Sequence, residues 1–323
     1  MTITSSSSPT CANAPSPSSH VDGAGAVVDH AASRVDHAAA KGSNATRPPI
    51  TPRKLPHRFA DVPRHWFGGF AVPSHIANGV NLLFPAGERF FVRSVYHYLD
   101  RIQDPALRAA IKGFGGQEGR HAKAHEDFFD TLRAQGYSID PFLRFYEWLS
   151  YTLLERVAPP SLRLSATAAA EHFTAIMAEG LTAETAFEQA HPAMRQLLLW
   201  HAAEELEHKS VAYDVLQAVN PSYPLRIAGL AVSTAMLATM WWAATLMLLR
   251  QDGIGPLTAW RRLRELRKQR GTEPIIRRVF ARGIRAYLAR DFHPDHHDNY
   301  HLAAVLLERA AAAGAELGDG AGA

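Results

Sequence analysis

The chain has 323 residues, of which 47% are hydrophobic and 20% are charged, a composition typical of a globular protein with a full apolar core. It has a formal net charge of +3, one cysteine and 17 histidines. One thiol excludes a disulfide scaffold, a zinc ribbon and an iron–sulfur cluster bound by this chain alone, because each needs several cysteines. Any metal ion must therefore be held by histidines and carboxylates.

Residues 1–60 are predicted to form a disordered tail. The first 50 residues are built largely from Ala, Ser and Pro and contain no aromatic side chain, so they cannot bury enough apolar surface to offset the entropy of ordering. The tail lacks a basic start followed by an apolar block, and no twin-arginine signal is present. We therefore expect a cytoplasmic protein.

From about Pro63 the pattern is helical, without alternating strand segments of useful length. Prolines, together with the glycine at position 136, mark where helices begin and end. The expected helices cover residues 85–103, 105–135, 141–157, 165–179 and 192–219. We predict an all-α fold, with a four-helix bundle domain at 61–222 followed by additional C-terminal helices.

Two of these helices have an inward face on which residues recur at alternating intervals of four and three, as in a helix bundle. The two faces are Leu107, Ile111, Phe114, Glu118, His121, His125, Phe128 and Leu132, and Met194, Leu198, His201, Glu205, His208, Ala212, Val215 and Val219. Acids and histidines interrupt the centre of each face. Burying an ionisable group costs several kcal/mol unless it is paired or bound to metal.

Both interruptions contain the motif Glu-x-x-His, at residues 118–121 and 205–208. Positions three apart share one face of a helix, so that one Glu and one His can reach the same ion. Glu88 and Glu171 lie on the other two helices, and the resulting set is the ligand pattern of di-iron and di-manganese carboxylate bundles. The predicted metal ligands are Glu88, Glu118, His121, Glu171, His201, Glu205 and His208.

Alternatives remain at several positions. The two faces could instead be salt-bridged polar layers, although comparable numbers of Lys or Arg are absent from them. His201, one turn before the second motif, is either a seventh ligand or a histidine that hydrogen-bonds a ligating carboxylate, and for His125 we favour the supporting role. Glu204 and Glu207 are expected to face solvent or neighbouring helices, and His172 points away.

The segment from Glu88 to His208 resembles the ferritin-like di-iron superfamily. The motif His201-x-x-x-Glu205-x-x-His208 is similar to that of arylamine N-oxygenases, in which the extra histidine is a ligand. The surrounding residues 84–91 and 117–121 more closely resemble a bacterial family of predicted metal-dependent hydrolases. The resemblance covers most of residues 65–300 and implies a ferritin-like bundle that holds two metal ions.

We expect O2-dependent oxidation or oxygenation of a small organic substrate at two iron ions, with manganese as an alternative metal. The chain lacks further thiols and a flavin motif, so an external electron donor is required. The alternative is a metal-dependent hydrolase that uses a metal-bound hydroxide on an ester or amide, although no dedicated nucleophile with its base accompanies the motifs. A third interpretation is a membrane-associated metal-binding protein without turnover.

Residues 227–249 carry no charge, and a helix of that length spans about 35 Å, enough for a bilayer core of about 30 Å. Three interpretations of this apolar segment, in the region 223–250, are open. It can be a membrane anchor, or a helix that lies on the membrane surface or re-enters it. It can also be a buried helix or an oligomer contact, for example in a homodimer. Residues 250–290 contain 12 Lys+Arg against 3 Asp+Glu, a net +9, which leaves −6 for the remainder. For this basic region, within residues 251–323, we favour anionic lipid over nucleic acid, because no nucleic-acid-binding motif accompanies it.

Two further features have open interpretations. Gly113, Gly115, Gly116 and Gly119 crowd the helix that carries the first motif, and they provide either room for substrate or close helix packing. The cluster at 292–298 is rich in His and Asp but lacks helical ligand spacing, so we interpret it as a structured loop, with auxiliary metal binding as the alternative.

Overall fold

The computed structural model of the chain describes residues 47–54, 59–183, 185–270 and 277–319. Within these ranges the regular structure is helical, and the only β-type pairing is an isolated bridge between Phe67 and Ala190. The α-helices are α1 (Ala71–Asn81), α2 (Phe84–Tyr96), α3 (Pro105–Ala134), α4 (Asp140–Glu147), α5 (Glu155–Val157), α6 (Pro160–Ala183), α7 (Pro192–His208), α8 (Val211–Val219), α9 (Tyr223–Gln251), α10 (Pro256–Arg270), α11 (Gly283–Tyr287) and α12 (His301–Asp319). The 3-10 helices are η1 (Leu99–Arg101), η3 (Thr185–Gln189) and η5 (Pro294–His296), and the π-helices are η2 (Trp148–Leu154) and η4 (Arg277–Arg282). The all-α prediction is confirmed.

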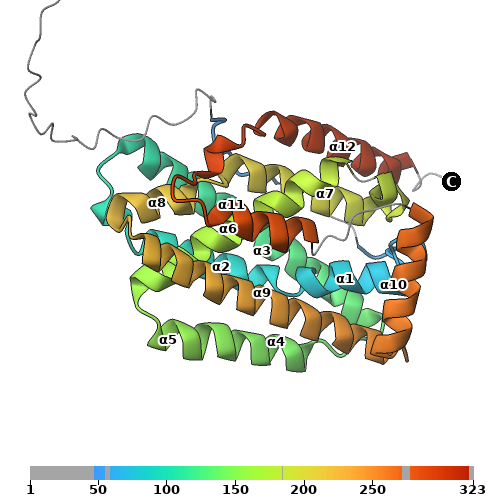
Figure 1. Ribbon diagram of the computed structural model, residues 1–323. Helices are drawn as coiled ribbons and strands as arrows, with labels where there is room; N and C mark the ends of the chain where they lie inside the picture. Colours follow the sequence, from blue (N-terminus) through green and yellow to red (C-terminus); the bar gives the residue numbers. More distant parts are fainter. Residues whose placement is uncertain (1–46, 55–58, 184, 271–276, 320–323) are drawn as a thin grey trace, which may run out of the picture. The chain divides into compact units, whose positions relative to one another are not determined.

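Helices α2, α3, α6 and α7 form the centre of the fold (Figure 1). Helix α2 packs against α3 and α6, and α7 packs against α6 and α3. Asp104 caps α3 by accepting a hydrogen bond from the backbone N–H of Ala106, and Pro105 occupies the first turn, where its missing N–H costs nothing. After α3, Gly136 has a φ of 87°, a left-handed conformation that glycine adopts without strain.

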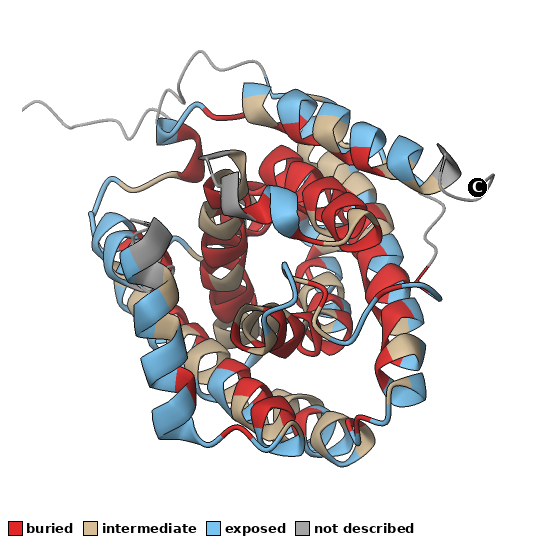
Figure 2. Ribbon diagram, turned by 90° about the vertical axis from the view of Figure 1, so that its right-hand side faces the viewer, coloured by how far each residue is buried: buried red, intermediate tan, exposed pale blue. Residues whose placement is uncertain are grey.

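The remaining long helices cover this centre. Helix α9 packs against α6 and α1, and α12 packs against α7. Figure 2 shows buried residues on the sides of the helices that face their neighbours and exposed residues on the outward sides. At Gly229 of α9 an added Cβ would collide with the backbone of Ser165, so this glycine sets the close approach of α9 to α6.

The predicted helix at 192–219 is divided in the structure. Helix α7 ends at His208 and α8 begins at Val211. Between them the ammonium group of Lys209 donates to the carbonyl of His297 and to Oδ1 of Asn299, each at 2.6 Å. The side chain at this break therefore anchors the segment that precedes α12.

Other boundaries also differ. The helix expected to run to residue 103 ends at Tyr96, and the one expected at 141–157 contains the π-helix η2. The helix expected to begin at residue 165 begins at Pro160, since proline is tolerated in a first turn. Of the predicted tail, residues 1–46 and 55–58 lie outside the described residues.

The His- and Asp-rich segment 292–298 contains the 3-10 helix η5. Asp295 within it is buried and accepts hydrogen bonds from Arg47, at 2.7 Å, and from the hydroxyl of Tyr300, at 2.5 Å. Its carboxylate is thus used to fasten a loop to the rest of the fold. These contacts support the structured-loop interpretation.

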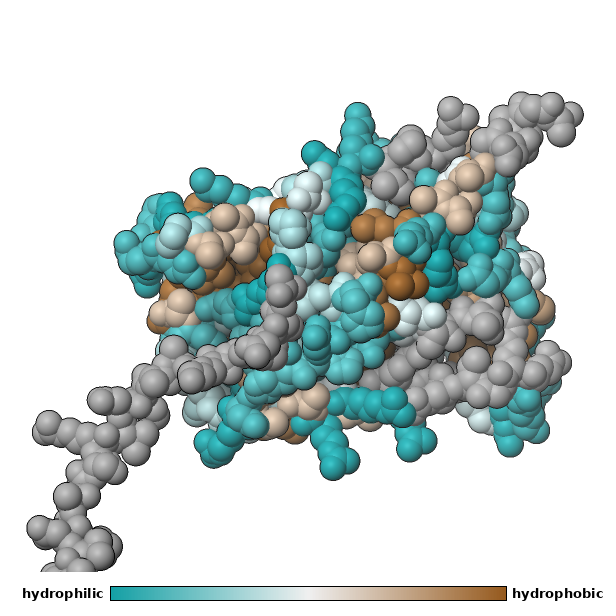
Figure 3. Space-filling model, turned by 90° about the horizontal axis from the view of Figure 1, so that it is seen from above, coloured by the Kyte–Doolittle hydropathy of each residue, from teal (hydrophilic) through white to brown (hydrophobic). Residues whose placement is uncertain are grey.

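Helix α9 contains the apolar segment 227–249. Among the described residues it is the one helix that is long and apolar enough to cross a membrane, by length and composition alone. It also packs against α1 and α6, and the indole N–H of Trp241 donates to the carbonyl of Ile76 at 2.7 Å. On the side of α12, Figure 3 shows a mostly hydrophilic face with small apolar patches. Membrane association stays a prediction.

Candidate metal centre

The seven predicted ligands are all brought together inside the four central helices. They come from α2 (Glu88), α3 (Glu118 and His121), α6 (Glu171) and α7 (His201, Glu205 and His208). Each of these residues is at most 4% exposed. The helix faces that the sequence predicted to point inward, where they carry these seven residues, are therefore buried in the fold.

Glu88, His121 and His201 form a first triad, in which one ligand atom from each residue lies within 4.8 Å of the other two. Nε2 of His201 is 3.6 Å from Oε1 of Glu88. The imidazole rings of His121 and His201 stack with their centroids 4.1 Å apart. One carboxylate and two imidazoles can hold a single divalent ion at this point.

Glu118, Glu205 and His208 form a second triad within the same limit of 4.8 Å. Nε2 of His208 lies 3.2 Å from Oε1 of Glu118 and 3.6 Å from Oε2 of Glu205. Glu171 stands beside this triad, with its Oε2 at 3.3 Å from the same nitrogen. The second group thus combines three carboxylates with one imidazole.

Glu205 belongs to both groups. Its Oε1 lies 2.8 Å from Nε2 of His201, while its Oε2 faces His208. One carboxylate that directs one oxygen to each group is the arrangement of a bridge between two ions. The second Glu-x-x-His motif stays within one triad, whereas the first is divided, with Glu118 in the second triad and His121 in the first.

The chemistry of these side chains fits a pair of cations. The buried oxygens of Glu88, Glu118 and Glu171 accept no hydrogen bond of ordinary geometry from the residues that the structure describes. Burial, followed by the neighbouring carboxylates, raises the pKa of Glu88 well above its ordinary value. Burial likewise raises the pKa of Glu171 to about 8. Such acids stay protonated at neutral pH unless positive charge is supplied, and two divalent ions supply it.

Glu205 and His208 are the charged pair within the centre. Burial alone would raise the pKa of Glu205, but the charges of His208 and His201 hold it well below its ordinary value. Burial opposes protonation of His208, yet the carboxylates around it raise its pKa well above the ordinary value. A metal-free centre therefore carries a proton on an imidazole where an ion would otherwise bind.

Two of the predicted histidine ligands have buried polar partners behind them. Nε2 of His121 is 2.9 Å from Oε2 of Glu204, and Nδ1 of His208 is 2.9 Å from Oε1 of Gln117. Gln117 in turn donates to Glu207 at 2.8 Å. Such partners fix the tautomer and the orientation of metal-binding imidazoles.

Arg53 connects these two supporting contacts. Its guanidinium donates to both oxygens of Glu207, at 2.6 and 2.7 Å, and to Oε1 of Glu204 at 3.2 Å. Glu204 and Glu207 were expected to face either solvent or neighbouring helices. They do not face solvent, because they are 0% and 5% exposed. The sequence contained no signal for Arg53, which lies outside every helical pattern.

His201 has its own supporting chain. Its Nδ1 lies 2.6 Å from Nε2 of His125, and Nδ1 of His125 contacts Oδ1 of Asn81. This placement agrees with a supporting role for His125, with Nε2 of His201 left directed at Glu88 and Glu205. His172 contacts the carbonyl of Gly283 and not the triads.

Comparison with known families adds a second line of evidence. Residues 51–298 match the model of a family described as predicted metal-dependent hydrolase. This chain belongs to that family. No curated protein and no solved structure matches it.

Membership in the predicted metal-dependent hydrolase family supports the alternative function better than the expected oxygenase. The matched range contains all seven predicted ligands. The family description agrees with a metal ion held by the buried Glu and His clusters. It does not name the metal, and the ferritin-like arrangement and the iron ions remain proposals.

In this family member two glycines of α3 serve close packing, whereas a Cβ at Gly119 would meet no atom within 4 Å. A Cβ at Gly113 would lie 2.5 Å from the carbonyl oxygen of Ile50, and one at Gly116 would lie 2.5 Å from Cγ of Pro52. The segment that leads to Arg53 therefore rests directly on the helix backbone. At these two positions the structure favours close packing over room for substrate.

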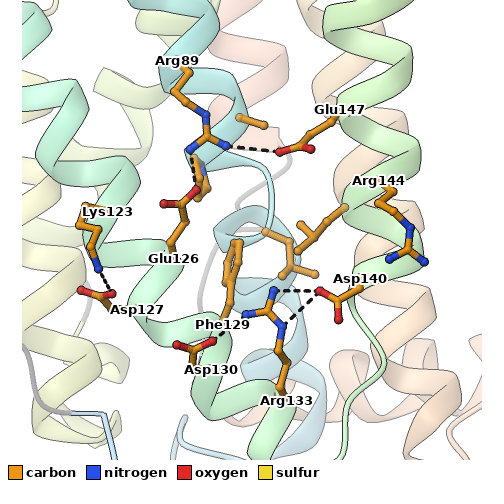
Figure 4. A pocket seen from close by; sticks show the side chains of 14 residues that line it. Arg89, Lys123, Glu126, Asp127, Phe129, Asp130, Arg133, Asp140, Arg144 and Glu147 are labelled. Atoms are coloured by element: carbon orange, nitrogen blue, oxygen red, sulfur yellow. Dashed lines mark hydrogen bonds and ion pairs between the residues drawn. The ribbon is translucent and has the colours of Figure 1, made fainter.

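Two cavities adjoin the helix that carries Glu88. A cavity of about 420 Å³ is lined by α2, α3 and α4, and Figure 4 shows ion pairs across it, among them Arg89 with Glu126 and with Glu147. Arg144 of α4 also lines this cavity. A second cavity of about 530 Å³ shares Arg89 and Arg144 and adds the aromatic side chain of Trp148. None of the seven predicted ligands is among the residues that line either cavity.

Proposed function

We propose that this chain is a metal-dependent hydrolase whose centre holds two divalent ions through Glu88, Glu118, His121, Glu171, His201, Glu205 and His208. The single observation that carries the proposal is the placement of Glu205, with one oxygen at each of two buried triads. The family description supports hydrolysis as the reaction. The substrate class is a small ester or amide.

Divalent ions bound here would act as Lewis acids and lower the pKa of water. In this proposal the attacking group is water, and no side-chain nucleophile is required. The residues of the chain hold and orient the centre: Glu204 and Gln117 fix the imidazoles of His121 and His208. Burial of the triads excludes bulk water, which strengthens electrostatic interactions within them.

O2-dependent oxidation is the second candidate, and one observation favours it. Four carboxylates and three imidazoles from four helices are the ligand types of di-iron and di-manganese carboxylate bundles. Mixed oxygen and imidazole ligands suit iron or manganese. In that case an external electron donor is a necessary partner.

Metal-dependent assays distinguish the two reactions. The purified chain is loaded separately with zinc, manganese and ferrous iron, and its metal content is measured. A panel of aryl esters and anilides tests hydrolysis, and an oxygen electrode with a supplied reductant tests O2 consumption. Hydrolysis that requires metal and disappears in Glu205→Ala supports the first proposal. O2 consumption by the iron form, without hydrolysis by any form, supports the second.

A further inference from the structure

A third cluster of ligand-type side chains lies outside the seven predicted ligands. It consists of His65 in the turn before α1, His75 on α1 and Asp252 directly after α9. Nε2 of His65 is 2.6 Å and Nε2 of His75 is 2.7 Å from the same oxygen, Oδ2 of Asp252. Three segments that are distant in sequence thus bring two imidazole nitrogens and one carboxylate oxygen to one point.

The other oxygen of Asp252 has a separate partner. Arg64 donates to Oδ1 from Nε at 3.0 Å and from a terminal nitrogen at 2.7 Å. The hydroxyl of Tyr137 lies 3.0 Å from Oδ1 and 3.2 Å from Oδ2. A carboxylate that ligates a metal is commonly hydrogen-bonded by outer partners in this way, so Arg64 is compatible with an ion on the Oδ2 side.

The protonation states of His75 and Asp252 are compatible with the metal binding that the geometry suggests. The side chain of His75 is 0% exposed, and burial lowers its pKa, so the ring is neutral at neutral pH. Burial alone would raise the pKa of Asp252, but hydrogen bonds from His75, His65 and Arg64 hold it below its ordinary value. A neutral imidazole and an ionised carboxylate are the forms that bind a metal ion, and ligation through Nε2 of His75 places the ring proton on Nδ1.

The cluster also has an open side. His65 and Asp252 line a cavity of about 610 Å³, whose wall includes Arg262 and Glu265 of α10. The side chain of His65 is 34% exposed. An ion can therefore enter from the cavity, and its remaining coordination positions would face that space.

We propose that His65, His75 and Asp252 form a mononuclear site for a divalent transition metal of the zinc or ferrous-iron type, independent of the dinuclear centre. Two histidines and one carboxylate are a recurrent ligand set for both ions. Tetrahedral ligation at about 2.0–2.1 Å puts ligand atoms roughly 3.3 Å apart. The contacts to Oδ2 must open by several tenths of an ångström, and we expect His65, which lies in a turn and is 34% exposed, to be the residue that moves.

Zinc titration of the full chain tests the site, with bound metal counted after gel filtration. Wild type is expected to bind one equivalent more than His65→Ala, and His301→Ala, which removes an exposed histidine elsewhere, is expected to match wild type. Arg64→Ala should weaken this equivalent by about 10–100-fold, the usual effect of losing an outer partner.

The dinuclear proposal is tested separately by Glu205→Ala, which should leave the equivalent that depends on His65. Loss of binding by Glu205→Ala alone, with His65→Ala indistinguishable from wild type, would overturn the third site. Cobalt gives a second measurement, because its visible spectrum reports the ligands, and His65→Ala should change the intensity of that spectrum. An unchanged cobalt spectrum would mean that the three side chains form only a hydrogen-bonded contact.

Discussion

Arg53 offers the sharpest test of how the centre is held. It is the cation nearest to two buried carboxylates, Glu204 and Glu207, whose side chains are 0% and 4% exposed. Glu204 contacts His121, and Glu207 reaches His208 through Gln117. One residue outside the four helices therefore supports a predicted ligand of each triad. Arg53→Ala removes the positive charge and leaves both carboxylates buried.

The magnitude follows from burial. Removing one partner of a buried ion pair costs about 3–5 kcal/mol, and the side chain of Arg53 is 30% exposed, so solvent screening reduces the expected loss to about 2–3 kcal/mol. For a chain of this size that loss lowers Tm by about 3–5 °C. Because both imidazoles lose their fixed orientation, metal affinity should fall about 10–100-fold. Arg53→Lys should be intermediate, since an ammonium group cannot serve both carboxylates as a fork does.

Calorimetric titration with zinc or manganese measures the affinity, and thermal unfolding with and without metal measures the stability. Arg133→Ala is the matched control, because Arg133 pairs with Asp130 and Asp140, which are 81% and 49% exposed. Exposed pairs contribute about 1 kcal/mol or less. Wild-type metal affinity in a folded Arg53→Ala protein would refute the reasoning.

Three further predictions follow from the same contacts. Glu205→Ala should remove both ions of the dinuclear centre and Glu88→Ala only one, as measured by bound metal per chain; equal losses would contradict the assignment of a bridge. Burial raises the pKa of Glu171 to about 8, above its value in the unfolded chain. The metal-free protein should therefore lose stability as the pH rises from about 5 to about 8, while its metal affinity increases. A Tm of the metal-free protein that increases over this range would contradict this prediction. Helix α9 packs against α1 and α6, so we expect the protein to attach to the membrane surface and not to span it. The attachment would use exposed residues such as Trp242 and the basic residues of α10. High salt or carbonate should then release the protein from membranes, whereas release by detergent alone would indicate a spanning helix.

The seven ligand candidates were accessible from the sequence because helical periodicity is a local property. Intervals of four and three place Glu118 and His121, or Glu205 and His208, on one face whatever the rest of the chain does. The same periodicity requires that face to be buried, and the structure buries it. Long helices with polar interruptions thus reveal which side chains share the interior.

Periodicity could not show how side chains from different helices group. The division of Glu118 and His121 between two triads depends on the relative rotation of α3 and α7, which is a tertiary property. Arg53 could not be predicted for a similar reason, since it lies in a non-helical segment that no sequence repeat marks. The cluster of His65, His75 and Asp252 joins three segments with no shared motif.

The charge balance explains why metal and folding should be coupled. Outside residues 250–290 the chain has a net charge of −6, and four of its acids lie in a buried centre where imidazoles are the nearest cationic groups. Without metal, three of these acids have raised pKa values, and the charge of Glu205 is balanced by a proton on His208. Metal ions displace those protons, so binding energy becomes folding energy. The centre is therefore expected to be a principal determinant of the stability of the fold as well as its reactive site.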